Sequence, residues 1–241
     1  MKINPNEFSF FDHLDELRGR LVKAIIAIIV GCIVFYRYLD AALYFLVKPV
    51  GHLVFTSPPE AFTARMMLMF LGGTFLALPY VIYQLWQFIG CALAPQERKY
   101  VSIYGFFSVI LFIMGIVFAY FLAVPYSIQF LLSFSSESMV PMITVKNYIS
   151  YVGTLLLGFG VVFELPLILM FLTRIGIATP EFLIQKRRHA IILILIVSAI
   201  ITPPDVVSQL VMALPLIVLY EIGIFVCKLT WKEARSSAVQ A

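Results

Sequence analysis

Six apolar segments, separated by short stretches that carry most of the charge, set the strongest limit on how this chain can fold. Their approximate bounds are 21–38, 67–90, 101–125, 148–173, 190–201 and 206–227. A helix of about 20 apolar residues crosses the hydrocarbon core of a bilayer. Only 12% of the residues are charged, against about 25% in a soluble domain. The pattern predicts an all-α, polytopic membrane protein with six transmembrane helices.

The lysines and arginines predict the orientation of these segments. Of the 17 such residues, thirteen fall on the cytoplasmic side if the N-terminus is cytoplasmic, and four fall on the other side. Because positive charge accumulates on the cytoplasmic side, both termini are expected there. Within 1–241 we expect a single membrane domain. It would comprise an amphipathic cytoplasmic helix at 1–20, a six-helix bundle at 21–228 and a cytoplasmic tail at 229–241.

The fifth segment, 190–201, is too short for an ordinary span. Its twelve residues would rise about 18 Å as a helix, against a hydrocarbon thickness of about 30 Å. Local thinning of the bilayer, contacts within an oligomer or a water-filled recess would accommodate it. We therefore expect one side of the molecule to be thin or concave. The loops at 39–66 and 126–147 are expected to form caps with short helices.

The sequence lacks the motifs of several enzyme classes. It contains no GxxxxGK[ST] nucleotide-binding loop, no HExxH and no GxSxG. The three histidines fall in separate loops, and the three cysteines show no metal-ligand or disulfide spacing. We expect no catalytic residue, no metal, no cofactor, no enzymatic activity and no nucleic-acid partner.

The segment SFFDHLDELRGRL, 9–21, carries several acids on the side expected to face the cytoplasm. Its apolar residues recur at helical spacing, and Glu16 and Arg20 form an i,i+4 pair. One interpretation is an anchor helix with a solvated acidic face. The other is a carboxylate patch for a cationic partner, joined by Glu97 from the next cytoplasmic loop. A guanidinium group would suit such a patch because it pairs with carboxylates through two parallel hydrogen bonds.

Two further polar features lie in or beside the apolar segments. Glu164 precedes Pro166 by two residues in the fourth segment, where a charge at mid-bilayer costs about 2.5–3.5 kcal/mol. It is interpreted either as a hydrogen-bonding group that fixes a kinked helix or as a functional acid. In TPPDVVSQ, 202–209, Asp205 is placed to cap the next helix, and Gln209 favours a docking edge for another transmembrane helix.

Taken together, these stretches resemble the TatC family, the multi-span receptor subunit of the twin-arginine protein translocase. The resemblance rests on HLDELRGRL (13–21), the FI…LxxxER region (88–98), GFGVVFELP (158–166), GIATPEFL (176–183), ITPPDVVSQ (201–209) and LPLIVLYEIG (214–223). It implies a glove-shaped bundle of six helices with a concave face, in which the fifth and sixth helices are short.

The resemblance also implies a function. Such a receptor binds the twin-arginine signal peptides of folded precursor proteins at the bacterial inner membrane. It assembles with the single-span subunits TatA and TatB and with further copies of itself, and translocation draws on the protonmotive force. The implied signal-peptide site contains Glu16, Glu97, Leu14, Arg18 and Phe88. Other implied roles are the buried acid Glu164, the structural prolines Pro49 and Pro166, and the partner-helix contacts Thr202, Asp205 and Gln209.

The sequence departs from the family pattern at two positions. Cys91 stands where proline is common, and Met67 stands where a lysine or another polar residue is frequent. A second functional interpretation is a proton-coupled small-solute transporter with Glu164 as its relay. The absence of internal repeats and of a second deep acid counts against that interpretation.

Overall fold

The chain is helical throughout the part that the structure describes. The computed structural model describes residues 10–91, 93, 98, 100–136, 141–201 and 206–239. Among these residues, the extended pairing is limited to one isolated bridge between Val54 and Thr144. The expected all-α fold class is thereby confirmed.

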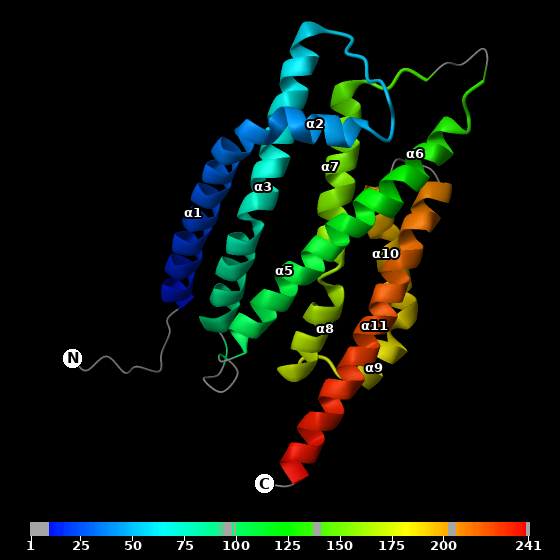
Figure 1. Cartoon of the computed structure of the whole chain (residues 1–241). Coiled ribbons are helices and arrows are strands. Elements are labelled where there is room, and N and C mark those ends of the chain that lie inside the picture. Colours follow the sequence, from blue (N-terminus) through cyan, green and yellow to red (C-terminus); the bar gives the residue numbers. More distant parts are fainter. Residues whose placement is uncertain are drawn as a thin grey trace. The chain divides into compact units, whose positions relative to one another are not determined.

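The helices vary widely in length (Figure 1). They are α1 (Phe10–Phe35), α2 (Leu39–Val47), α3 (Pro58–Cys91), α5 (Val101–Phe118), α6 (Val124–Leu132), α7 (Val145–Val162), α8 (Leu165–Arg174), α9 (Pro180–Gln185), α10 (Arg187–Ile201) and α11 (Val206–Val239). A 3₁₀ turn, η1 (Tyr36–Tyr38), links α1 to α2, and a π-helical turn, η2 (Ala119–Ala123), links α5 to α6.

Five helical stretches in the described residues are long and apolar enough to cross a membrane. These are His13–Val47, Pro58–Cys91, Val101–Leu132, Val145–Arg174 and Met212–Trp231. α10 has only 15 residues, in agreement with the short fifth segment predicted from the sequence. These helices indicate a multi-pass integral membrane protein.

The chain divides into two compact units. The first comprises Met1–Val109 with Thr144–Ile149, and the second comprises Ile110–Ile143 with Ser150–Ala241. α5 and α7 therefore contribute residues to both units.

In the first unit, α1 lies alongside α3 through small residues (Figure 1). A Cβ atom added at Gly31 would overlap the carbonyl oxygen of Gly73, and one added at Gly73 would lie 2.5 Å from the backbone nitrogen of Cys32. Small residues let helices approach closely in a membrane, where dispersion forces replace the hydrophobic effect as the source of packing energy. The opposite face of α1 exposes large aliphatic side chains such as Ile33, as expected of a surface that contacts lipid.

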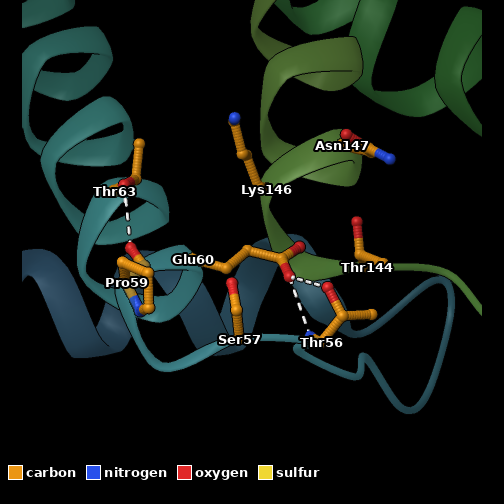
Figure 2. Close-up of a pocket in the computed structure, with 8 residues that line it drawn as sticks. All are labelled: Thr56, Ser57, Pro59, Glu60, Thr63, Thr144, Lys146 and Asn147. Carbon is orange, nitrogen blue, oxygen red and sulfur yellow. Dashed lines mark hydrogen bonds between the residues drawn. The ribbon is translucent and has the colours of Figure 1, made fainter.

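A cap at one end of the first unit joins α2, the following loop and the first turns of α3 and α7. The Tyr148 hydroxyl donates a 2.6 Å hydrogen bond to the Leu46 carbonyl. The carboxylate of Glu60 accepts hydrogen bonds of 2.8 Å from both the backbone N–H and the hydroxyl of Thr56 (Figure 2). A polar cavity of about 440 Å³ lies beside Glu60. α2 is the short helix that was expected in this first cap. Pro49 lies exposed in the turn that ends α2.

In the second unit, α11 packs against α8 and α10. A Cβ atom at Gly223 would lie 3.3 Å from Cα of Pro166, so α11 passes close to the first turn of α8. The Gln209 side chain of α11 donates a 2.9 Å hydrogen bond to the Leu195 carbonyl of α10. These contacts join both α8 and α10 to α11.

The fourth segment breaks where the sequence predicts a kink. α7 ends at Val162 and α8 begins at Leu165. Pro166 has no N–H to donate to the Val162 carbonyl one turn earlier, so the regular hydrogen-bond ladder stops there. The Glu164 N–H instead bonds the Val161 carbonyl at 3.1 Å.

The start of the chain continues into the first span without a break. Residues 10–20, from the amphipathic helix expected at 1–20, and most of the span expected at 21–38 form one continuous helix, α1, that ends at Phe35. The only helix-weakening residue between them is Gly19, and an interior glycine costs about 1 kcal/mol. Packing against α3 outweighs that cost.

The helices that contain the second and sixth predicted segments are also longer than predicted. The expectation of a short sixth helix at 206–227 is wrong, because α11 has 34 residues and continues to Val239 through most of the expected tail, 229–241. Its last turns, KLTWKEARSSAV, contain no proline or glycine and several strong helix formers. α3 begins at Pro58 rather than near 67, because proline suits the first turn of a helix. The polar residues before position 67 interrupt the apolar pattern in the sequence but do not interrupt the helix.

Candidate functional site

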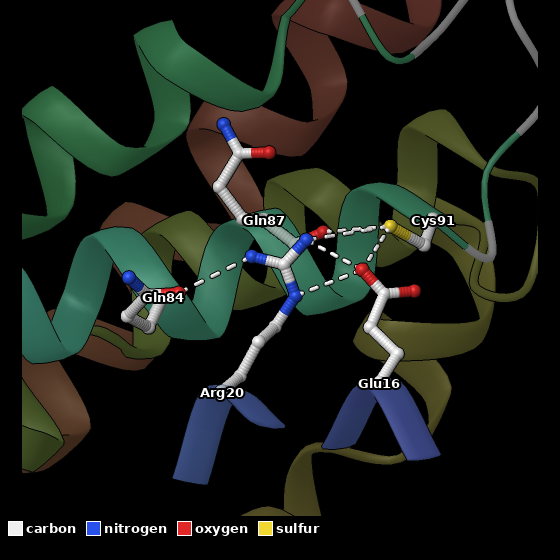
Figure 3. A network of polar contacts seen from close by, with 5 residues as sticks. All are labelled: Glu16, Arg20, Gln84, Gln87 and Cys91. Carbon is white, nitrogen blue, oxygen red and sulfur yellow. Dashed lines mark hydrogen bonds and ion pairs between the residues drawn. The ribbon is translucent and has the colours of Figure 1, made fainter. Parts of the chain in front are cut away.

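The first turns of α1 and the last turns of α3 form a polar cluster in the first unit. Glu16 and Arg20 are one turn apart on α1, so their side chains lie on one face of that helix. Gln84, Gln87 and Cys91 recur at spacings of three and four residues on α3, which also places them on one face. The two faces meet, and the side chains of Glu16, Arg20, Gln84 and Cys91 form one network with the backbone carbonyl of Gln87 (Figure 3).

The Arg20 guanidinium is the centre of this network. Its Nε and Nη2 atoms donate to the same oxygen of Glu16, Oε1, at 2.9 and 2.5 Å. Its Nη1 atom donates to Oε1 of Gln84 at 3.2 Å. One guanidinium therefore joins a carboxylate on its own helix to an amide on the neighbouring helix.

Cys91 completes the network. Its thiol donates to Oε1 of Glu16 at 2.8 Å and lies 3.3 Å from the Gln87 carbonyl oxygen. Nη2 of Arg20 lies 3.6 Å from the sulfur. The residue that departs from the family pattern is thus a direct partner of the predicted binding acid.

The environment of the Glu16–Arg20 pair is partly shielded from solvent. The two side chains are 25% and 19% exposed, respectively. A charge removed from water to this degree is stable only with an opposite charge or good hydrogen bonds. All hydrogen bonds described for Glu16 end on Oε1, and Figure 3 shows its second oxygen pointing away from the other four residues.

The structure brings some of the predicted signal-peptide residues together. Phe88 is half-buried on α3 and stacks against the His13 ring with centroids 4.4 Å apart. Leu14 and Arg18 are exposed on α1. Glu97 lies outside the described residues, so its proximity to Glu16 stays a prediction.

A small apolar pocket adjoins the polar network. It has a volume of about 140 Å³ and lies between α1 and α3. Phe88, Leu17 and Val81 contribute apolar walls, and Arg20 and Gln84 also line it. A bound chain could therefore place a cationic group at Glu16 and an apolar group beside it.

The residues predicted to contact a partner helix are less fully described. Thr202 and Asp205 lie outside the described residues. Gln209 is half-buried, and its amide nitrogen bonds α10. Glu164 is half-buried at the break between α7 and α8, next to the buried Pro166. The exposed acid Glu221 of α11 forms a 2.7 Å ion pair with Arg187 of α10.

Sequence reasoning missed four contributors to the polar network: Arg20 as the bridging group, the side chains of Gln84 and Cys91, and the backbone carbonyl of Gln87. The available signal was the recurrence of polar side chains on one face of a helix that is otherwise apolar. No group of three or more His, Cys, Asp or Glu residues suited to a metal ion occurs in the described part of the chain.

Comparisons with known proteins place this chain beside TatC proteins. The family model described as Sec-independent protein translocase protein (TatC) matches residues 12–215. A curated TatC from Carboxydothermus hydrogenoformans is 40% identical over 225 residues, which cover 91% of this chain and 93% of the relative. TatCy from Bacillus subtilis is 33% identical over 250 residues, covering 98% and 95% of the two chains.

A solved structure agrees with these matches. A crystal structure of a protein described as Twin Arginine Translocase Receptor-TatC aligns with a TM-score of 0.82 and 36% sequence identity. The alignment covers 90% of this chain and 99% of the solved one. The helices, their order and the sequence similarity over nearly the whole length lead to one conclusion: this chain belongs to the TatC family of Sec-independent protein translocase components, which are transport subunits rather than enzymes.

Proposed function

We propose that this chain is the receptor subunit that binds twin-arginine signal peptides, and that Glu16 contacts the arginine pair together with Glu97. The observation that carries the proposal is the contact between Glu16 and Arg20. The carboxylate already accepts two hydrogen bonds from a guanidinium group. A site that holds an internal arginine in this way has the shape and charge to hold an arginine of a ligand.

The surroundings of Glu16 support the same proposal. Phe88 and Leu17 line an apolar pocket next to the carboxylate, and Leu14 and Arg18 lie exposed on the same helix. A signal peptide that combines arginines with apolar residues would use both kinds of surface. The similar protein of known crystal structure is itself described as a twin-arginine translocase receptor.

The proposed assembly follows from family membership and the sequence. The chain would lie in the bacterial inner membrane as one membrane domain with both termini in the cytoplasm, as its lysines and arginines predict. TatA and TatB type subunits would dock along the edge that contains Thr202, Asp205 and Gln209, and copies of the chain would self-associate. The protonmotive force would drive transport. Membership of a translocase family replaces the alternative of a small-solute transporter.

Binding of a fluorescent twin-arginine signal peptide to the purified complex in nanodiscs tests the proposal. Replacing both arginines of the peptide by lysine should weaken binding at least about tenfold, because an ammonium group lacks the planar fork of a guanidinium. Glu16→Gln and Glu97→Ala should each weaken binding of the arginine peptide by a similar factor. Glu181→Gln, which removes an exposed acid from α9, is the matched control and should bind normally. Equal binding of the two peptides would refute the proposed recognition.

A further inference from the structure

The group bound to Glu16 in this structure has the same chemistry as the proposed ligand. Arg20 directs two of its three guanidinium nitrogens to Oε1 of Glu16 and the third to Gln84. A ligand arginine that binds Glu16 through the same hydrogen bonds therefore meets a carboxylate that is already occupied. Binding then becomes an exchange of one guanidinium for another.

The geometry provides a route for such an exchange. The second oxygen of Glu16 points away from Arg20 and Cys91 (Figure 3), so an incoming cation can contact it while Arg20 is still in place. When Arg20 releases Oε1, it can keep its 3.2 Å hydrogen bond to Gln84 on α3. That hydrogen bond offsets part of the cost of separating the guanidinium from its carboxylate in a partly shielded site.

We propose that Arg20 is an internal competitor for the Glu16 carboxylate and that it lowers the affinity of the site for every ligand that must displace it. This inference rests on the proposed function of Glu16. A ligand guanidinium replaces the two hydrogen bonds of Arg20 in kind, whereas an ammonium is a compact charge without the planar fork. The cost of releasing Arg20 is the same for both ligands, so it lowers both affinities equally and leaves their ratio to the hydrogen bonds that each ligand forms with Glu16.

The competitor also prevents the empty site from attracting cations at random. Glu16 and Arg20 together carry no net charge, so a single passing cation gains little from the pair. A ligand binds well only if its own hydrogen bonds to Glu16 replace the two that Arg20 gives up. Cys91 donates to the same oxygen and holds the carboxylate in place during the exchange.

Two variants of Arg20 test the inference. Arg20→Lys replaces the forked competitor by a weaker one, and Arg20→Gln removes its charge. Arginine-pair and lysine-pair versions of one fluorescent signal peptide are each titrated against the full complex in nanodiscs. The dissociation constant obtained from each titration is independent of the fraction of folded receptor. Lys23→Gln removes an exposed cation from the same helix and is the matched control.

The expected result is tighter binding of both peptides. Their dissociation constants should fall about tenfold in Arg20→Gln, by a smaller factor in Arg20→Lys and not at all in Lys23→Gln. The arginine-to-lysine ratio of the affinities should stay near the wild-type value, because the release of Arg20 costs the same for either ligand. A wild-type receptor that discriminates, with affinities unchanged or weakened in both Arg20 variants, would overturn the inference and leave the proposed function intact. A wild-type receptor that binds both peptides equally would overturn the proposed function itself.

Discussion

Two glutamates of the first unit, Glu16 and Glu60, are held by different kinds of partner. Glu60 is 8% exposed, and its carboxylate accepts from a backbone N–H and a hydroxyl of Thr56. Glu16 accepts from a long, charged side chain that can move away and from the Cys91 thiol. We interpret the two environments differently: short-range partners from the preceding loop make a structural tie at Glu60, and a displaceable cation suits the binding site proposed at Glu16.

The partners of each glutamate also differ in what they connect. Thr56 precedes α3, and Glu60 lies in its first turn, so their hydrogen bonds fix the entry of the chain into the helix, as in a capping box. The Glu16 network joins α1 to α3 across 64 to 75 residues of sequence. Loss of Glu60 is therefore expected to loosen a loop, and loss of Glu16 is expected to remove a ligand contact.

The largest effect is expected from disturbing the contact between α1 and α3, because both glutamates depend on the position of α3. In Gly73→Val, the new side chain would overlap the backbone of α1, because even a Cβ atom would lie 2.5 Å from the Cys32 nitrogen. Overpacking of this kind costs about 1–3 kcal/mol or more, and both sites should be disturbed. The loss of stability is measured by heating the purified protein and quantifying the fraction that remains folded by size-exclusion chromatography. Gly19→Ala, at an open position on α1, is the control, and equal stability of the two variants would contradict the close packing of α1 and α3.

The second effect separates the two glutamates. Glu60→Ala should leave the affinity for a twin-arginine peptide within about twofold of the wild type, because Glu60 belongs to a different network. It should, however, increase amide hydrogen exchange in the loop at 52–57, where the Thr56 N–H loses its acceptor. Asp40→Ala, which removes an acid that is 83% exposed on α2, should do neither. Protection of the loop together with a loss of peptide affinity would reverse the roles of the two glutamates.

The smallest effect concerns Cys91. Cys91→Ala removes one weak donor to Glu16 and should lower peptide affinity by about two- to threefold, whereas Cys91→Ser keeps a donor and should bind nearly as the wild type does. Titration of the fluorescent peptide against the three proteins measures the difference. If serine and alanine reduced affinity equally, the hydrogen bond from residue 91 would have no part in binding.

The sequence predicted the fold to the extent that local patterns determine it. Apolar segments located the helices, and Pro166 located the break after Val162, because a missing N–H acts on its own helix wherever the helix lies. The ends of α3 and α11 were missed, since a change to polar residues looks like a helix end in sequence although Pro58 and the run after Val226 continue the helix.

The site was predicted only in part, for a related reason. Glu16 and Phe88 could be singled out from their motifs, but the partners of Glu16 come from another helix. Nothing in the spacing of Gln84 and Cys91 says which helix they face, and that choice depends on close contacts such as the one between Gly31 and Gly73. Likewise, the ion pair between Arg187 and Glu221 joins residues 34 positions apart. The glove-like shape expected from the resemblance stays a prediction.

Site-specific photocrosslinking tests the central claim most directly. A photoreactive residue at position 17, in the pocket beside Glu16, is combined with a labelled twin-arginine precursor in the membrane-embedded complex. We predict a crosslink that is lost with the lysine-pair precursor and in Glu16→Gln, but is kept in Glu60→Ala. A crosslink of equal strength in Glu16→Gln would contradict the assignment of this carboxylate as the group that binds the arginines.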